Sequence, residues 1–336
     1  MEQLTAGSGA AITWPVAPTK QGYTFPGWST DDADVIGDSF TMPARPVAFT
    51  GSWTANTYTV TFKANSGSVS PASKDVTYNS AYGDLPIPTR DNYEFAGWYT
   101  QATGGTQVTK DTDVTITADQ TLYAHWIEAY NLWVGGQRVT KNNASNIFGD
   151  GKSSYNASTK TLTLENYTYS GNGSRYIDGA EYYGSIVYEG FAYPTLTIVL
   201  EGTNSITNTS GGNAWNCGIY VAKAHLTIQG GSLEVKGDIG YTSHGICVHN
   251  GTLPIENGQV TAIAQSAGGS SGIFTGQNVV INGHTVTSKG HTAALSKTLT
   301  LGTGVSAEVS TDYSGTNAME YTGTLTGMKC FHSPKR

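Results

Sequence analysis

The chain has 336 residues, of which 13% are charged, about half the share that is usual in globular domains. Gly occupies 42 positions and Thr is abundant, a composition that disfavours helices because helix surfaces are normally built from Glu, Lys, Arg and Ala. The net charge of −7 is spread along the chain without a basic stripe, which excludes the usual electrostatic footprint of a nucleic-acid or anionic-membrane binder. We therefore expect an all-β protein with no nucleic-acid partner.

The first 126 residues contain an internal repeat with the pattern P-T-[KR]-x-x-Y-x-F-x-G-W. The pattern occurs at 18–28 and again at 88–98, and each copy is followed by a strand-like run that ends on a second tryptophan. A module of about 70 residues buries little surface, so we expect its rings to form the core rather than an exposed sugar-stacking face. The predicted core residues are Tyr23, Phe25, Trp28 and Trp53 in the first copy and Tyr93, Phe95, Trp98 and Trp126 in the second.

The second copy opens with an alternating strand at 58–62 and a turn at 65–67, for which the first copy has no counterpart. We therefore expect the chain to begin inside a repeat. The segments 58–62, 93–98 and 122–126 resemble the Listeria–Bacteroides repeat, also called the internalin B-repeat. This resemblance implies a small β-grasp-like module of bacterial surface proteins, used as a spacer or weak contact surface, and hence an extracellular location with the signal and anchor outside this chain.

A second periodicity follows residue 180. Gly-Ile pairs stand at 218–219, 245–246 and 272–273, a spacing of 27 residues, and two columns of short apolar strands recur in step with them. These columns are 226–228, 253–255 and 279–281, and 233–235, 260–262 and 285–287. Short strands separated by Gly, Asn and Ser, with apolar residues in columns, are typical of a parallel β-helix. We expect a right-handed β-helix over 184–325, preceded by a cap at 130–166 that contains a Gly-Gly turn.

The segments 132–136 and 155–166, together with the Gly-Ile strands, resemble a β-helical domain of gut-bacterial surface proteins that is described as carbohydrate-binding-like. The chain is then expected to divide into three parts. These are a truncated repeat module at 1–56, a complete module at 57–127 and a capped β-helix at 128–336.

Parallel β-helices include polysaccharide lyases and hydrolases, which need paired carboxylates or an acidic Ca²⁺ cluster with a nearby base. The side chains that follow the Gly-Ile pairs supply neither, and the carboxylates fall in different columns. These carboxylates are Glu234, Asp238, Glu256 and Glu308. We therefore expect no enzymatic activity and no cofactor.

The histidines and cysteines do not indicate a metal site. His244 and His249 flank an inward Ile246, so we expect them to face different directions, and no carboxylate or thiol completes a ligand set. Cys217 and Cys247 lie three strand positions out of step, which places their Cα atoms on the order of 11 Å apart, beyond disulfide reach. We expect free thiols, including Cys330.

The aromatic-rich segment 167–193 has the pattern that most favours ligand binding. Tyrosines interleaved with charged groups suit stacking on pyranose rings, although the same tyrosines could instead pack this segment against the first turns of the β-helix. The candidate ligand-binding residues are Tyr176, Tyr182, Tyr183, Tyr188, Phe191, Tyr193, Arg175 and Asp178.

These features favour a non-catalytic, adhesin-like protein of the bacterial surface. The repeats would form a stalk, and the β-helix would contact a glycan or a host or cell-surface protein without membrane insertion. A polysaccharide-active enzyme or its carbohydrate-binding module, and a purely structural spacer, are the alternatives.

Overall fold

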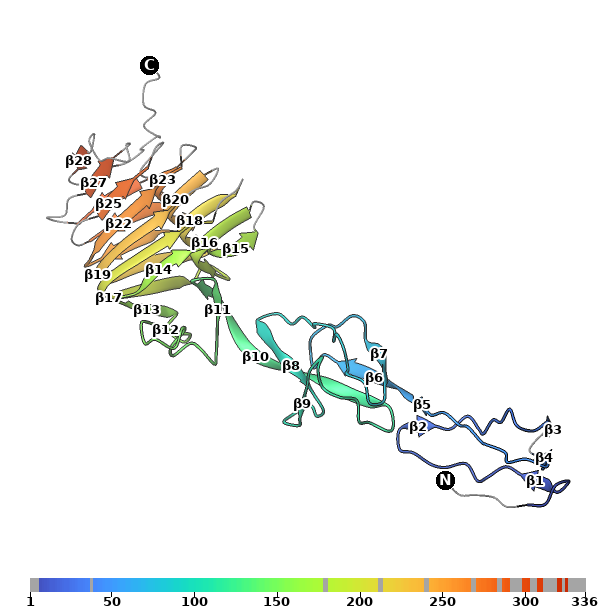
Figure 1. Ribbon diagram of the computed structural model, residues 1–336. Coiled ribbons are helices and arrows are strands. Elements are labelled where there is room, and N and C mark those ends of the chain that lie inside the picture. The colour runs from blue at the N-terminus through green and yellow to red at the C-terminus, as the bar shows by residue number, and fades with distance from the viewer. Residues whose placement is uncertain are drawn as a thin grey trace. The chain divides into compact units, whose positions relative to one another are not determined.

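The structure, a computed structural model, describes residues 6–36, 39–177, 181–210, 214–238, 242–266, 270–282, 286–290, 298–302, 307–310, 319–321 and 324–325. Every regular element in these ranges is a β-strand, which confirms the all-β class (Figure 1). No helix that could cross a membrane occurs in the same ranges. The chain forms two compact units that divide after Trp126, within strand β10 (Gln120–Val134).

The described residues of the first repeat module form five short strands. β1 (Ala11–Thr13), β4 (Ser39–Thr41) and β3 (Val35–Ile36) form an antiparallel sheet in that order, and β2 (Tyr23–Thr24) pairs with β5 (Thr54–Ala55). A continuous series of ring contacts, with centroids 4.9–6.5 Å apart, joins Phe40, Trp14, Phe49, Trp28, Phe25, Trp53 and Tyr23. The predicted core rings of this module therefore contact one another, but of the series only Phe40 is fully buried.

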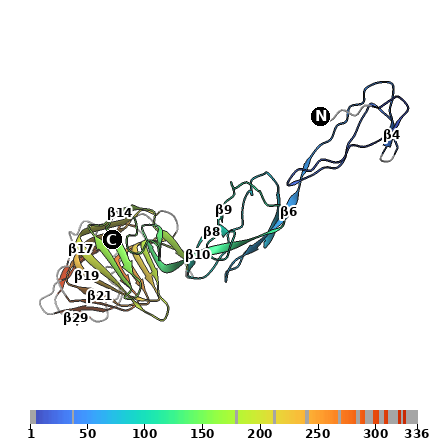
Figure 2. The same ribbon diagram turned by 90° about the horizontal axis from the view of Figure 1, so that it is seen from below.

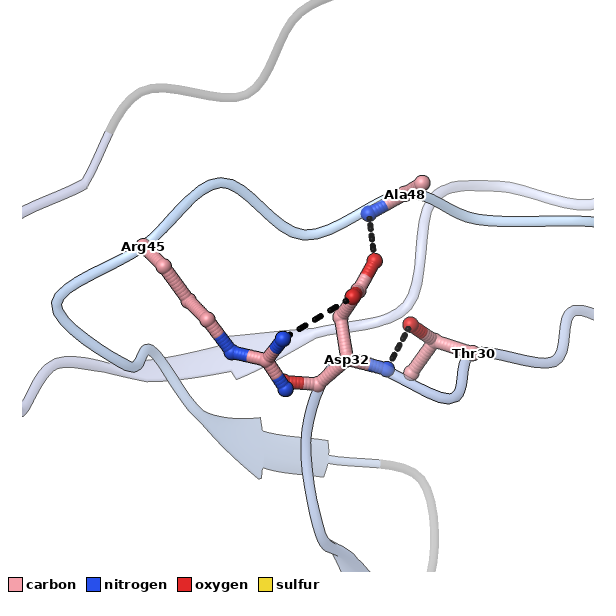
Figure 3. Close-up of polar contacts among 4 residues, drawn as sticks. All are labelled: Thr30, Asp32, Arg45 and Ala48. Atoms are coloured by element: carbon pink, nitrogen blue, oxygen red, sulfur yellow. Dashed lines mark hydrogen bonds and ion pairs between the residues drawn. The ribbon is translucent and has the colours of Figure 1, made fainter.

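Asp32 holds the segment 45–48 in place in this module (Figure 3). Its Oδ2 accepts a hydrogen bond from the Ala48 N–H at 2.8 Å, and its backbone carbonyl accepts one from Arg45 Nη2 at 2.9 Å. The Arg45 Nη1 lies 3.4 Å from Oδ1, and the Asp32 N–H donates to Thr30 Oγ1 at 3.1 Å. One residue, through its side chain and its backbone, thus fixes the start of the run that leads to Trp53.

The second module has longer strands and a buried core. β6 (Thr57–Lys63) pairs antiparallel with β7 (Ser73–Thr77) and parallel with 120–123 of β10, while β8 (Tyr93–Tyr99) pairs with β9 (Gln107–Val108) and β10. Val60, Phe62 and Leu122 are buried and alternate with less buried residues on their strands, as period-two burial requires, and they belong to one core with Trp98. Phe95 and Trp126 are half-buried against this core, and Tyr93 lies under the Arg90 guanidinium, 3.6 Å from its ring centre.

The second unit is a parallel β-helix with three faces, whose strands stack one above the next (Figures 1 and 2). The first face contains β16 (Glu181–Glu189), β18 (Trp215–Ala222), β20 (Thr242–His249) and β23 (Ser271–Thr275). The second face contains β13 (Thr161–Glu165), the first parts of β17 (Thr195–Asn208) and β19 (His225–Gly237), β21 (Leu253–Glu256), β24 (Asn278–Ile281) and β26 (Thr298–Leu301). The third face contains β14 (Thr168–Gly171), the later parts of β17 and β19, β22 (Gln259–Ala264), β25 (Val286–Lys289) and β27 (Ala307–Ser310).

Apolar columns fill the interior of the β-helix, as the 27-residue spacing predicts. On the first face Ile186, Ile219, Ile246 and Ile273 lie side by side in successive strands, and none of the four is exposed to solvent. The third face differs from the expected register by one position, because Val286 rather than residue 285 lies beside Val260. This register places a valine inside, where burial of its apolar side chain is favourable, and residue 285 lies outside the described residues.

The repeat glycines mark a bend in the first face, where the chain passes close to the neighbouring strands. A Cβ atom on Gly245 would lie 2.7 Å from the Ile263 nitrogen and 2.8 Å from the Gly272 carbonyl oxygen. A Cβ atom on Gly218 would meet Val235 and the Gly245 oxygen, also too closely. Glycine is required at this bend because any larger residue would collide with backbone.

Among the described residues, antiparallel strands cover two of the three faces at each end of the stack. At the start, residues 132–134 of β10 pair with β16, β11 (Gln137–Thr140) pairs with β10, and β12 (Ser153–Asn156) pairs with β13. The predicted Gly-Gly turn joins β10 and β11, with φ of 54° at Gly135 and 82° at Gly136, as a two-residue type I′ hairpin needs. At the other end, β28 (Met319–Tyr321) pairs with β27 and β29 (Thr324–Leu325) with β26. Covered edges cannot pair with strands of other chains.

Candidate functional site

A second apolar cluster lies on the outer side of the first face, opposite the interior columns. Its fully buried members are Tyr182, Val187, Cys217, Tyr220, Ala222 and Cys247, and Trp133, Tyr176, Trp215 and Phe274 pack against them half-buried. We call this set the outer aromatic cluster. The bend at the repeat glycines creates it, because Cys217 before the bend and Tyr220 after it both point outward.

Stacked rings organise the outer aromatic cluster. The Tyr182 and Tyr220 rings lie 4.4 Å apart at 23°, and Tyr176 lies 5.5 Å from Tyr220. Trp215 lies 5.5 Å from Tyr182 and 6.2 Å from Phe274, so aromatic contacts run across four strands. The half-buried rings keep part of their surface open to solvent, which is the property that sugar stacking requires.

A polar group lies on the hairpin of β15 (Ser174–Ile177) and β16, on the opposite side of the hairpin from Tyr176 and Tyr182 because side chains alternate along each strand. The pairing sets Arg175 beside Tyr183 and Tyr176 beside Tyr182. The Glu181 carboxylate accepts hydrogen bonds from Arg175 Nε and, at 2.9 Å, from Tyr183 Oη. The hydrogen bond from Arg175, followed by that from Tyr183, lowers the pKa of Glu181, so this side chain is an ionised acceptor at neutral pH. The hairpin thus carries a carboxylate, a guanidinium and a phenol on one face and two rings of the outer aromatic cluster on the other.

Both histidines of the first face lie on the outer side, so the expectation that they face different directions was wrong. His244 packs between Trp215, at 5.5 Å, and Phe274, at 5.1 Å, whereas His249 lies 6.0 Å from Tyr182. The bend at Gly245 reverses the alternation between them. Burial lowers the pKa of His244 to about 4, so its ring is neutral at physiological pH. Across the described ranges, no three His, Cys, Asp or Glu side chains gather as metal ligands would.

The two cysteines are closer together than their offset along the strands suggested. Cys217 and Cys247 are free thiols in the outer aromatic cluster, fully buried and joined by a thiol–thiol hydrogen bond. In the strand register Cys217 lies beside His244 and Cys247 beside Tyr220, and both side chains belong to the same buried cluster. Burial raises the pKa of the Cys217 thiol, which favours the unreactive protonated form. Cys330 lies outside the described residues.

The structure separates the eight predicted ligand-binding residues into several places. Tyr176 and Tyr182 belong to the outer aromatic cluster, and Arg175 and Tyr183 to the hairpin beside it. Tyr188 instead fills the interior of the β-helix, where it is 5% exposed.

The remaining predicted residues lie elsewhere. Phe191 and Tyr193 belong to the turn after β16, at the other end of that strand from the hairpin, and are 92% and 49% exposed. Positive φ values at Ala192 and Tyr193 fix this turn, and the Tyr193 ring lies 6.2 Å from His225. Asp178 lies outside the described residues.

Sequence reasoning missed Trp215, Tyr220 and Phe274 as partners of these tyrosines. Tyr220, Cys247 and Phe274 each stand two residues after a repeat glycine, and the strand register confirms that they form one column. This column could be read from the 27-residue spacing. Contact between the column and Tyr182 could not, because it requires that β16 is the first strand of the same face.

Comparison with known proteins places the repeats in a family. Residues 1–45 and 58–125 match the Listeria-Bacteroides repeat domain. The chain is similar to Internalin H of Listeria monocytogenes, with 37% identity over 133 residues, which cover 38% of this chain and 23% of that protein. It is also similar to a predicted Gly-rich membrane protein of Evansella cellulosilytica, with 29% identity over 154 residues (42% of this chain, 17% of the relative). A predicted membrane protein of the same organism is 28% identical over 176 residues (51% of this chain, 26% of the relative). The chain thus spans about a quarter or less of the length of these relatives, and its residues 1–45 and 58–125 are Listeria-Bacteroides repeats.

Proposed function

We propose that this chain is part of a non-catalytic, adhesin-like protein of the bacterial surface, whose β-helix contacts a glycan through the outer aromatic cluster. The observation that carries the proposal is that Tyr176, Trp215 and Phe274, from three different strands, are half-buried at the margin of one stacked cluster, where each keeps part of its ring open to solvent. Ring faces stack on the apolar face of a pyranose. A β-helix supplies a rigid support on which such groups keep their positions.

The surface location is supported by the repeat family and by the relatives. The resemblance to internalin repeats implies modules of bacterial surface proteins, and two relatives carry the name of membrane proteins. In this setting the repeat modules act as a stalk.

The placement of the carboxylates supports a non-catalytic role. Glu234 lies on the third face in an ion pair with Lys236 at 2.7 Å, whereas Glu256 lies on the second face and accepts a hydrogen bond from Asn282 at 2.7 Å. Two carboxylates on different faces cannot flank one glycosidic bond, which hydrolysis requires.

A glycan array probed with the full chain and with variants tests the proposal. Trp215→Ala and Tyr176→Ala should each weaken binding about tenfold, because stacking on one ring contributes on the order of 1 kcal/mol or more. Tyr123→Ala, in the repeat unit, is the matched control and should bind as the parent chain does. Each variant must keep its thermal transition, because both rings also pack against buried neighbours.

Other outcomes would support other functions. Loss of binding on Phe191→Ala but not on Trp215→Ala would move the contact to the exposed turn. The absence of glycan binding, with a melting curve that shows a folded chain, would favour a structural spacer. Release of unsaturated or reducing sugar from a polysaccharide would favour an enzyme.

A further inference from the structure

The two repeat modules meet at a junction where only Asn56 separates strand β5 from strand β6 (Figure 1). β5 pairs with β2 in the first module, and β6 pairs with β7 in the second. The Asn56 N–H donates to the Gly22 carbonyl at 2.9 Å, and the Asn56 carbonyl accepts a hydrogen bond from the Tyr78 N–H at 2.9 Å. One residue therefore carries the strand pairing of the first module directly into that of the second.

Side chains add further contacts at this junction. Asn56 Oδ1 accepts a hydrogen bond from Thr24 Oγ1 at 2.6 Å in the first module, and Asn56 Nδ2 donates to Tyr58 Oη at 3.3 Å in the second. The Tyr78 ring lies 5.5 Å from the Tyr23 ring at 74°, which is an edge-to-face arrangement. The two modules are therefore joined by backbone and side-chain contacts as well as by the chain that links them.

The Tyr78 ring packs directly on the backbone of Gly22. Gly22 is buried, and a Cβ atom at this position would overlap the base of the Tyr78 ring. Any side chain at position 22 would therefore displace the ring that the following module supplies, so this contact requires glycine.

The second module shows that the turn itself does not require glycine. The turns 20–23 and 90–93 are alike, because in each the last N–H donates to the first carbonyl, at 3.1 and 3.2 Å. Gly22 has a φ of 76°, and its counterpart Asn92 has a φ of 59°, so both are left-handed. Asparagine adopts this conformation more readily than most residues. Glycine at position 22 is thus explained by the packing of the next module and not by the turn.

The polar contacts of the junction also lack counterparts after the second module. Asn56 follows the closing tryptophan of its module by three residues, and the same position after the second module is Ala129. Thr24 corresponds to Glu94, whose carboxylate cannot donate a hydrogen bond as the threonine hydroxyl does. The second module, which the β-helix follows, therefore lacks all three residues with which the first module contacts the next repeat.

We propose that Gly22, Thr24 and Asn56 form a docking surface for the next repeat of the chain, and that this contact holds the two repeats in one orientation. The group that docks is the tyrosine directly after the second strand of that repeat, which is Tyr78 here. A repeat with asparagine at the turn, as in the second module, does not dock a further repeat in this way. The contact belongs to the repeats alone, so it does not depend on what the β-helix binds.

Double electron–electron resonance on the full chain measures whether the two modules keep one orientation. Spin labels are attached through Thr41→Cys and Thr61→Cys, at exposed strand positions of the first and second modules, in a Cys330→Ser background. The two described native thiols are buried. We expect a single narrow distance distribution, which Gly22→Asn should broaden. The matched variant Asn92→Gly, at the same position of the second module, should leave it narrow.

Hydrogen exchange tests the same contact independently. The Asn56 and Tyr78 amides should exchange about tenfold faster in Gly22→Asn, because overpacking weakens the contact that protects them. The Ser29 and Thr50 amides, which bond to each other's carbonyls inside the first module, should keep their exchange rates and so report that this module is folded. Tyr78→Ala removes the ring without altering the turn, and should broaden the distance distribution as Gly22→Asn does.

The proposal would be wrong if the parent chain gave a broad distance distribution, or if the distribution stayed equally narrow in Gly22→Asn and Tyr78→Ala. Equal acceleration of the Asn56 amide in Asn92→Gly would also overturn it, because the effect would then not depend on which turn is changed. If Gly22→Asn also exposes the Ser29 amide, Tyr78→Ala decides, since its turn is unaltered: a broadened distribution supports the docking surface, and an unchanged one refutes it.

Discussion

Replacing Gly245 by alanine should destabilise the protein more than the same substitution at a glycine whose Cβ position has no neighbouring atom within 4 Å. The added Cβ would lie 2.7 Å from the Ile263 nitrogen, 2.8 Å from the Gly272 oxygen and 3.0 Å from the Ala262 carbonyl carbon. Ordinary contacts between heavy atoms are about 3.5–4.0 Å, so neighbouring strands must move by about 0.5–1 Å. All three atoms belong to backbone, so no side-chain rotation can relieve the crowding.

The loss in free energy of unfolding follows from the size of this shift. Overpacking of a core costs roughly 1–3 kcal/mol, and the rigid backbone on three sides of Gly245 places this substitution near the upper value, about 3 kcal/mol. Gly149 provides the control. Its φ of 78° is strained for alanine, but nothing lies within 4 Å of its Cβ position, so Gly149→Ala should cost about 1 kcal/mol.

Hydrogen exchange read out by mass spectrometry can check these values strand by strand. In a solenoid each rung contacts only its neighbours, so the effect of Gly245→Ala should concentrate in β18, β20 and β23. A loss of about 3 kcal/mol corresponds to exchange about 100-fold faster there. Equal acceleration by both variants, or unchanged exchange in Gly245→Ala, would refute the reasoning that close backbone approach requires glycine at this bend.

Three further predictions concern buried groups. The pKa of His244 is about 4 in the folded chain and about 6.5 in the unfolded chain, so the unfolded chain binds the proton more tightly. The free energy of unfolding should therefore fall as the pH drops from 6.5 toward 4, by on the order of 3 kcal/mol. Urea unfolding should show that the free energy of unfolding decreases between pH 7 and pH 4.5, and that this decrease is smaller in His244→Gln than in the parent chain or in His249→Gln. Equal decreases in all three chains would contradict the prediction. Ellman's reagent should label at most one of the three cysteines in the native chain, because Cys217 and Cys247 are buried, and all three in urea. Trp98→Ala should lower the free energy of unfolding by about 3–5 kcal/mol, because Trp98 is buried. Trp28→Ala, at the half-buried equivalent position of the first module, should lower it clearly less. Thermal melts of the two variants would show the difference.

Periodicity in the sequence predicted the interior of the β-helix well. Apolar residues at a spacing of 27 must share a column if the fold is a solenoid, and Ile219, Ile246 and Ile273 do so. The outer side was not predictable in the same way, because the bends reverse the alternation of side chains. Tyr182 and Tyr188 lie an even number of residues apart, so a straight strand would place both on one face. In the fold one belongs to the outer aromatic cluster and the other to the interior.

The repeat motif shows a second limit of sequence reasoning. Trp28 and Trp98 occupy the same position of the same pattern, and each indole N–H donates to a proline carbonyl, that of Pro15 at 3.0 Å and that of Pro86 at 2.8 Å. Local geometry therefore follows the motif. Burial does not follow the motif alone, because in the second module it also depends on β6, which lies outside the motif.

The 27-residue step between Gly218, Gly245 and Gly272 has a consequence for how such a chain can change in length. Loss or duplication of one 27-residue segment by recombination would bring one Gly-Ile bend to the place of the next, so the three faces would stay in register. The interior position holds isoleucine in each of these rungs, while the outer column holds Tyr220, Cys247 and Phe274 in turn. Gaining or losing a rung would therefore leave the packing of the remaining rungs intact and alter only the series of outward side chains. The outer surface can then change between related chains with little loss of stability.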